Sequence, residues 1–81
     1  MNKPTVLEAL LPVREKMVDL QREGKIVIQG FTWGFEKSGV YVTIEVEIRK
    51  TREYVCRSFT GKYAEGAVLQ ALGLLDQIEK L

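Results

Sequence analysis

A strict alternation of apolar and polar residues from position 40 to 48 is the clearest pattern in the chain. Val40, Val42, Ile44, Val46 and Ile48 alternate with Tyr41, Thr43, Glu45 and Glu47, which is the period of a β-strand with one buried face. The stretch before it holds the only Trp and two of the three Phe. The polar run Glu36-Lys37-Ser38-Gly39 between them is typical of a turn. We therefore predict a β-hairpin with strands over about 25–35 and 40–49.

The register of this hairpin follows from side-chain pairing. A loop of two or four residues gives the pairs Phe31–Ile44, Trp33–Val42 and Phe35–Val40 on one face, and Thr32–Thr43 and Gly34–Tyr41 on the other. A loop of three residues would move the aromatic side chains to the face opposite the Val/Ile row. We choose the first register, which makes Phe31, Trp33 and Phe35 the centre of the core.

A third strand is expected over about 53–60, after the basic turn Lys50-Thr51-Arg52. A three-residue loop would pair Arg49 with Glu53 and Glu45 with Arg57, two opposite-charge pairs on one face. Tyr54, Cys56 and Ser58 would then point to the core. The other parity would bury Arg57 without a partner, which is costly, so we choose the paired register.

Two helices flank the strands. In the first, over about 5–23, Thr5 and Glu8 form a capping-box pattern ahead of an apolar stripe, and Gly24 ends it. Pro12 predicts either a kink near positions 7–11 or a helix that begins at Pro12. The second helix spans about 62–80 and is capped near Thr60. Its internal glycines, Gly66 and Gly73, suggest that another backbone approaches closely.

The predicted fold is a single α+β domain over 1–81, with the order α-β-β-β-α and a three-stranded antiparallel meander sheet. Two helices can cover one face of such a sheet, so the second face stays open. In our register the open face carries apolar residues within a charged rim, which is the pattern of a moderate protein interface. The candidate interface residues are Ile26, Ile28, Tyr41, Val55 and Phe59.

Composition changes this picture in one respect. The chain has 81 residues, 46% of them hydrophobic and 28% charged, which excludes intrinsic disorder. A domain of this size buries only about 60% of its unfolded surface, so oligomerisation would help it and a homodimer is expected. With one Cys, no long apolar run and no leader-like start, we expect a cytoplasmic protein without a disulfide or a membrane segment.

The charge is unevenly distributed, although the net charge is only +1. Positive residues gather around the second turn and the strand after it. They form a candidate basic patch of Arg49, Lys50, Arg52, Arg57 and Lys62.

Catalytic chemistry is not indicated. The chain has no His, which removes the commonest general base and zinc ligand, and its one Cys, Cys56, reads as a small core residue. Glu45 and Glu47 share a strand face with Arg49 and Arg57, so ion pairs explain them better than paired catalytic carboxylates. The glycines match no phosphate-binding or dinucleotide motif. We expect no enzyme activity, no cofactor and no metal.

The element order is similar to that of double-stranded-RNA-binding domains. In that family a lysine cluster at the start of the final helix grips phosphates, and the loop between the first two strands reaches a minor groove. Here Lys62 stands alone before Tyr63, Ala64 and Glu65, and the hairpin loop with Lys37 and Ser38 has no histidine. The likeness therefore lies in topology only.

Two functions are compatible with these observations. The first is a protein-interaction module that associates with itself, or with another protein, through the open sheet face or an edge strand, in a regulatory or adaptor role. The alternative is a nucleic-acid-binding module that uses the turn at 49–52 together with Lys62.

Overall fold

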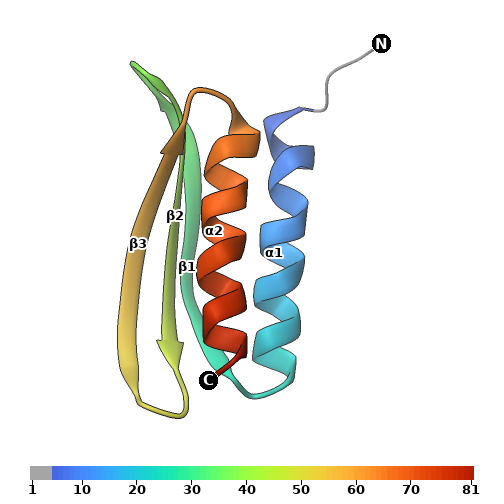
Figure 1. Cartoon of the computed structure of the whole chain (residues 1–81), viewed down its shortest axis with the longest axis vertical. Helices are drawn as coiled ribbons and strands as arrows, with labels where there is room; N and C mark the ends of the chain where they lie inside the picture. The colour runs from blue at the N-terminus through green and yellow to red at the C-terminus, as the bar shows by residue number, and fades with distance from the viewer. Residues whose placement is uncertain (1–4) are drawn as a thin grey trace.

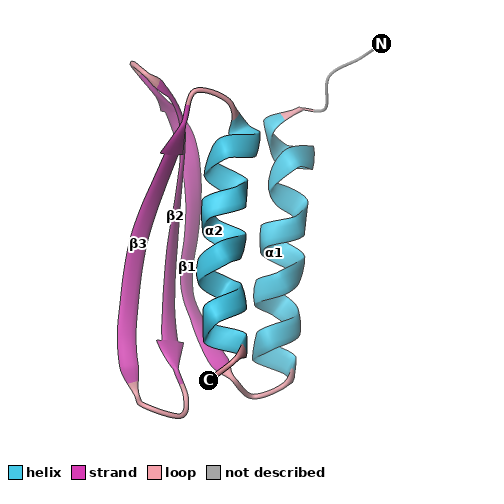
Figure 2. Cartoon of the chain, viewed as in Figure 1, coloured by secondary structure: helices cyan, strands magenta, loops and turns pink. Residues whose placement is uncertain are grey.

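Strand β2 (Gly39–Ile48) lies at the centre of a three-stranded antiparallel sheet, between β1 (Ile26–Glu36) and β3 (Glu53–Gly61) (Figure 1). The computed structural model describes residues 5–81. In chain order the elements are α1 (Val6–Arg22), β1 (Ile26–Glu36), β2 (Gly39–Ile48), β3 (Glu53–Gly61) and α2 (Ala64–Glu79). Both helices cover the same face of the sheet and lie side by side (Figure 2). The predicted single α+β domain with a meander sheet is confirmed for the described residues, and positions 1–4 lie outside them.

Helix α1 has the ends that its sequence predicts. The Thr5 Oγ1 accepts the backbone N–H of Glu8 at 3.2 Å, which caps the first turn. At the other end Gly24 adopts a φ of 75°, and the N–H groups of Gly24 and Lys25 donate to the carbonyls of Gln21 and Leu20. These two bonds form a Schellman motif. The helix begins at Val6 and includes Pro12, so the alternative of a start at Pro12 is wrong.

The hairpin register between β1 and β2 is confirmed from Gly30 onwards. The observed pairs include Phe31–Ile44, Trp33–Val42 and Phe35–Val40, together with Thr32–Thr43 and Gly34–Tyr41. Glu36 pairs with Gly39, so the loop has two residues. Val42 and Ile44 are fully buried under the helices, as a central strand with one covered face requires.

A β-bulge corrects the prediction for the first half of β1. The register shifts between Ile28 and Gly30, which leaves Gln29 without a partner on β2. Because one extra residue reverses the alternation, Ile26 and Ile28 pair with Ile48 and Val46 on the helix-covered face. Ile26 is fully buried. The placement of both isoleucines on the open face was therefore wrong.

Strand β3 is also displaced by one residue from the predicted register. Ile48 pairs with Glu53, so the turn spans the four residues 49–52, and Ile44 rather than Glu45 faces Arg57. Val55 and Phe59 consequently lie on the helix side, packed against the core. Arg57 shares that side and is still exposed. The burial cost that we assigned to this parity does not arise, because β3 is the outermost strand.

Three glycines bring β2, β3 and α2 together at one end of the molecule. A Cβ on Gly61 would come within 2.8 Å of the backbone N of Ala67, and Gly66 lies against the Cα of Gly61. Gly39 has a φ of 150°, and a side chain there would strike the Gly61–Lys62 backbone. The predicted close approach is confirmed at Gly66 and absent at Gly73, which has nothing within 4 Å.

Helix α2 starts later than predicted. Thr60 belongs to β3, and the helix begins at Ala64 after Tyr63, whose side chain makes no capping hydrogen bond. Small residues on the buried side, Ala67 and Ala71, let the helix lie close to the sheet.

The core lies between the helix pair and β2. It includes Leu10, Val13, Met17 and Leu20 of α1, Val42, Ile44 and Val46 of β2, and Ala67, Ala71 and Leu75 of α2. At its margin the Lys16 Nζ lies 2.7 Å from Glu79 Oε1 and 3.7 Å from Asp76 Oδ1, which joins α1 to α2. The hydrogen bond between Lys16 and Glu79 raises the pKa of Lys16 and lowers the pKa of Glu79.

Candidate interaction surfaces

The open face of the sheet is lined by hydroxyl groups, carboxylates and Tyr side chains. Its residues include Val27, Gly30, Thr32 and Gly34 on β1, Tyr41, Thr43, Glu45 and Glu47 on β2, and Tyr54, Cys56, Ser58 and Thr60 on β3. Of the predicted interface residues, Tyr41 alone lies here, and Ile26, Ile28, Val55 and Phe59 lie on the other face. The open face is therefore more polar than we predicted.

Several polar groups of the open face bind one another. The Thr43 and Ser58 hydroxyl oxygens are 2.7 Å apart, and the Tyr54 hydroxyl donates to Glu45 Oε2 at 2.6 Å. The hydrogen bond to Glu45 raises the pKa of Tyr54 to about 12. Cys56, which we expected to fill the core, is exposed directly opposite Glu45.

An exposed apolar surface lies at the hairpin end of the molecule. Trp33 and Phe35 share the helix-covered face of β1 but are 36% and 70% exposed, with their rings in an edge-to-face contact at 5.9 Å. They lie at the rim of the molecule, so our placement of both at the centre of the core was wrong. Phe31, nearer the middle of the strand, does pack against the core.

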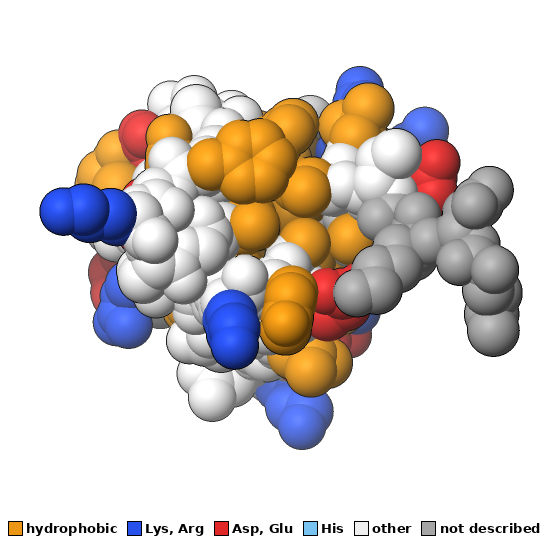
Figure 3. Space-filling model, turned by 90° about the horizontal axis from the view of Figure 1, so that it is seen from above, with side chains coloured by type: hydrophobic (Ala, Val, Ile, Leu, Met, Phe, Trp, Pro, Cys, Tyr) orange, Lys and Arg blue, Asp and Glu red, His pale blue; other side chains and the backbone are white. Residues whose placement is uncertain are grey.

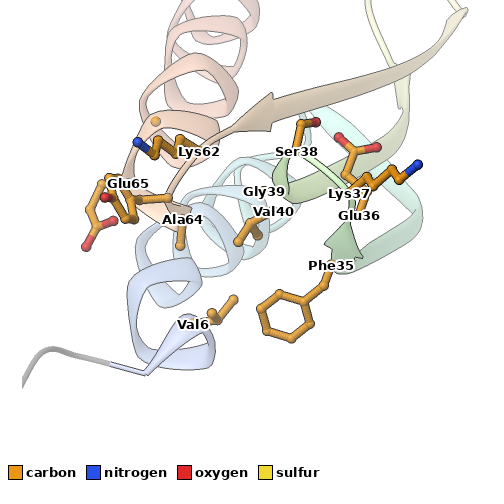
Figure 4. A pocket seen from close by; sticks show the side chains of 12 residues that line it. Val6, Phe35, Glu36, Lys37, Ser38, Gly39, Val40, Lys62, Ala64 and Glu65 are labelled. Carbon is orange, nitrogen blue, oxygen red and sulfur yellow. The ribbon is translucent and has the colours of Figure 1, made fainter.

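A hollow of about 1020 Å³ opens beside Phe35. Figure 4 shows Phe35 and Val6 facing the same space, with Val40 and Ala64 behind them. Seen from this end, hydrophobic side chains gather over the hollow (Figure 3). Its rim carries Glu36, Lys37, Lys62 and Glu65. We name Val6, Trp33, Phe35, Val40 and Ala64 the hairpin-end surface. The rim carries equal numbers of acidic and basic side chains, so it does not favour a partner of either charge.

Element lengths could have revealed the exposure of Trp33 and Phe35. Strand β1 has 11 residues and spans about 36 Å, whereas α1 has 17 residues and spans about 26 Å. A hairpin longer than the helices that cover it must project beyond them. The side chains of β1 near the tip, Trp33 and Phe35, then remain exposed.

The candidate basic patch is divided between the two ends of the sheet. Arg49, Lys50 and Arg52 lie in the exposed β2–β3 turn, where Arg52 takes a φ of 60° and the Lys50 Nζ donates to the carbonyl of Leu81 at 2.8 Å. Lys62 follows the far end of β3 and lines the same hollow as the hairpin residues Lys37 and Ser38 (Figure 4). Because β3 has nine residues, about 30 Å separates the two sites. Arg57 lies between them on the helix side.

The two edges of the sheet differ in how far they are closed. On β1, Gln29 forms the bulge, and the Ile28 N–H donates to the Gln21 side-chain oxygen at 2.9 Å. On β3, side chains bind the backbone only at the ends: Thr51 Oγ1 accepts the Glu53 N–H, and Gln70 donates to the Thr60 carbonyl. The described structure shows no such contact to the stretch 54–59. That stretch is the free part of the β3 edge.

Groups that could carry chemistry are dispersed. Within residues 5–81 no three His, Cys, Asp or Glu side chains lie close enough together to hold a metal ion, and no buried side-chain nitrogen or oxygen lacks a hydrogen-bond partner. In the same range, no helix is long and apolar enough to span a bilayer.

Comparison with known proteins gives no relative: no family model, no curated protein and no solved structure matches the chain. The topological likeness to double-stranded-RNA-binding domains rests on element order alone.

Proposed function

We propose that this protein is a non-enzymatic interaction module that works by associating with a second copy of itself. The observation that carries the proposal is the free part of the β3 edge. There the peptide groups that face away from β2 meet no side chain of the described residues. Such an edge is a template for pairing with another strand.

The composition of β3 suits this role. Besides its charged residues the strand carries Tyr54, Val55, Phe59 and Thr60, which are residue types that favour extended backbone. Neither Pro nor Lys, which commonly block edge pairing, occurs in β3. The β1 edge, by contrast, is interrupted by its bulge and by Gln21. A small domain also gains from burying more surface, so self-association would stabilise the fold as well.

Sedimentation equilibrium tests the proposal directly. We expect a reversible monomer–dimer equilibrium between low micromolar and near-millimolar protein. A chain that stays monomeric over this whole range would overturn the proposed function. Fluorescence of Trp33, the only Trp, gives a second readout that reports whether the hairpin end becomes buried.

Nucleic-acid binding is the alternative that the sequence suggested, and the structure gives it less support. The phosphate backbone is best neutralised by a continuous row of cations, but Lys62 and the turn residues Arg49, Lys50 and Arg52 lie at opposite ends of β3. Titration of generic duplex and single-stranded nucleic acid at low salt separates the two functions. Binding that is lost in a Lys50→Glu, Arg52→Glu variant would favour the alternative.

A further inference from the structure

We infer that the second copy pairs with β3 in antiparallel register about Val55, so that Glu53 of each copy faces Arg57 of the other. This inference rests on the proposed self-association and names the surface and geometry through which it occurs. The result is a continuous six-stranded sheet with a two-fold axis through the Val55 pair. All four helices lie on one face of that sheet.

The side chains of Glu53 and Arg57 are unpaired within the monomer. Their partners on β2 are Ile48 and Ile44, and no ion pair involves either of them among residues 5–81. Both are exposed on the helix side of the outermost strand. They are therefore available to a neighbouring strand.

Their spacing makes the strand complementary to itself. Glu53, Val55 and Arg57 occupy alternate positions, so all three side chains lie on the same face of β3. A two-fold axis through Val55 places a positive charge opposite a negative one twice and an apolar pair between them. Opposite charges directly across a strand pair are favourable, and like charges are not.

Neighbouring registers lose this match. An axis through Arg57 would set two Arg57 side chains against each other, and an axis through Cys56 would set Glu53 against Phe59. An axis further along the strand would meet Thr60, whose carbonyl already accepts from Gln70. Among the registers that keep the helices on one face, pairing about Val55 is the one that matches charge.

The position of α2 allows this pairing. The helix contacts both β2 and β3, so its axis lies between them, about one strand spacing from the proposed two-fold axis. The two copies of α2 would then be about 10 Å apart, which is a normal packing distance for helices. The flank of α2 that would meet its copy carries Gln70, Leu74 and Gln77, since Gln70 already reaches β3.

Charge reversal with rescue is the first test. Arg57→Glu and Glu53→Arg should each weaken dimerisation about tenfold or more at low salt, because each places like charges opposite one another. The double variant carrying both substitutions restores opposite charges and should return the dissociation constant to within a few-fold of wild type. Arg14→Glu, on the exposed side of α1, is the matched control and should leave the association unchanged. Circular dichroism verifies that every variant is folded.

A cysteine scan in a Cys56→Ser background reads the register itself. Residues directly opposite on antiparallel strands are close enough for a disulfide. Val55→Cys should therefore form a covalent dimer under mild oxidation, whereas Arg57→Cys in the same background, and Cys56 in the wild-type chain, should not. Cross-linking at 56 or 57 in preference to 55, or at none of them, would overturn the register.

The failures of the two proposals are distinguishable. If the chain dimerises but the double variant does not recover, and substitution of Phe35 by Ser abolishes association instead, the hairpin-end surface is the contact. Self-association then stands and pairing through β3 is wrong. If no dimer forms at any concentration, the proposed function itself is wrong.

Discussion

The phenol ring of Tyr41 lies across Gly34 on the neighbouring strand of the open face. The two residues are directly paired, and a Cβ placed on Gly34 would come within 2.8 Å of the Tyr41 ring. A glycine in a strand normally costs stability. Here its missing side chain provides the space that the aromatic ring fills.

Replacing Gly34 by Ala should therefore destabilise the protein by about 1 kcal/mol, since the cost of crowding exceeds the gain in backbone entropy. The sign should reverse in a Tyr41→Ala background, where the same change should stabilise by about 0.5 kcal/mol. Urea denaturation of the four proteins in this cycle measures both effects. A cost that persists without Tyr41 would show that the ring is not its cause.

Gly73→Ala should have the opposite effect in the wild-type chain. Gly73 lies inside α2, is exposed, and has nothing within 4 Å of the position that a Cβ would take. Alanine should stabilise the helix by about 1 kcal/mol, which in a domain of this size corresponds to a rise in Tm of about 4–8 °C. Thermal denaturation followed by circular dichroism measures the shift. Gly66→Ala is the comparison, and its gain should be smaller because Gly66 lies against Gly61.

Phe35 and Ile44 should differ sharply when each is cut to Ala. Phe35 is 70% exposed, so Phe35→Ala should lower the free energy of unfolding by about 1 kcal/mol or less. Ile44 is fully buried, so Ile44→Ala should lower it by about 2–5 kcal/mol. Chemical denaturation at low protein concentration, where dimers are absent, gives both values. Equal losses would place Phe35 in the core after all.

The ion pair between Lys16 and Glu79 predicts a dependence of stability on pH. The pKa of Glu79 is lowered from its ordinary 4.5 by the hydrogen bond with Lys16. The contribution of this pair is therefore fully present above pH 4.5 and is lost as the pH falls through the lower pKa of the folded state. Glu79→Gln should lower stability at neutral pH and flatten this acid limb. Urea midpoints from pH 7 down to 2.5 in both proteins test it, with Glu15→Gln on the exposed side of α1 as a control.

Tyr54 should titrate above the ordinary range of a Tyr side chain. Its hydrogen bond to Glu45 raises the pKa to about 12 from the ordinary 10.0. Since the pKa is raised on folding, the stabilisation is complete below pH 10 and is lost as the pH rises towards 12. Ultraviolet absorbance of wild type and Tyr54→Phe assigns the late step. In Glu45→Gln the step should move back towards 10, and a late step that survives this substitution would rule out Glu45 as the cause.

The element order and the hairpin register could be predicted because several independent patterns agree. The alternation in β2, the pairing of aromatic with branched residues and the Thr5 and Gly24 helix ends all indicate the observed structure. Local signals of this kind depend only on neighbours in the chain.

The predictions failed where strict alternation was assumed. In β1 the large apolar residues stand at even positions before Gly30 (Ile26 and Ile28) and at odd positions after it (Phe31, Trp33 and Phe35). A break in parity next to a glycine signals a bulge, and we did not use it. In β3, we assumed that a side chain on the helix side would be buried, which holds for a central strand. Because β3 is the outermost strand, the Arg57 side chain on that side still reaches solvent.

The candidate site could not be read from the sequence for the same reason. Whether Val55 and Arg57 point to the helices or away from them depends on a turn of four rather than three residues. That single residue reverses every side chain of β3. It also decides whether Glu53 and Arg57 are used within the monomer or left available to another molecule.

The contact between Lys16 and Glu79 has a consequence for folding. The two residues are 63 positions apart, whereas the two hairpins join neighbouring strands. Closing so long a loop costs more chain entropy than closing either turn, so we expect the contact between α1 and α2 to form after the sheet. During folding, the apolar side of α1 remains without its helical neighbour until almost the whole chain is in place. Packing of α2 against α1 and the sheet is therefore the step that completes the core.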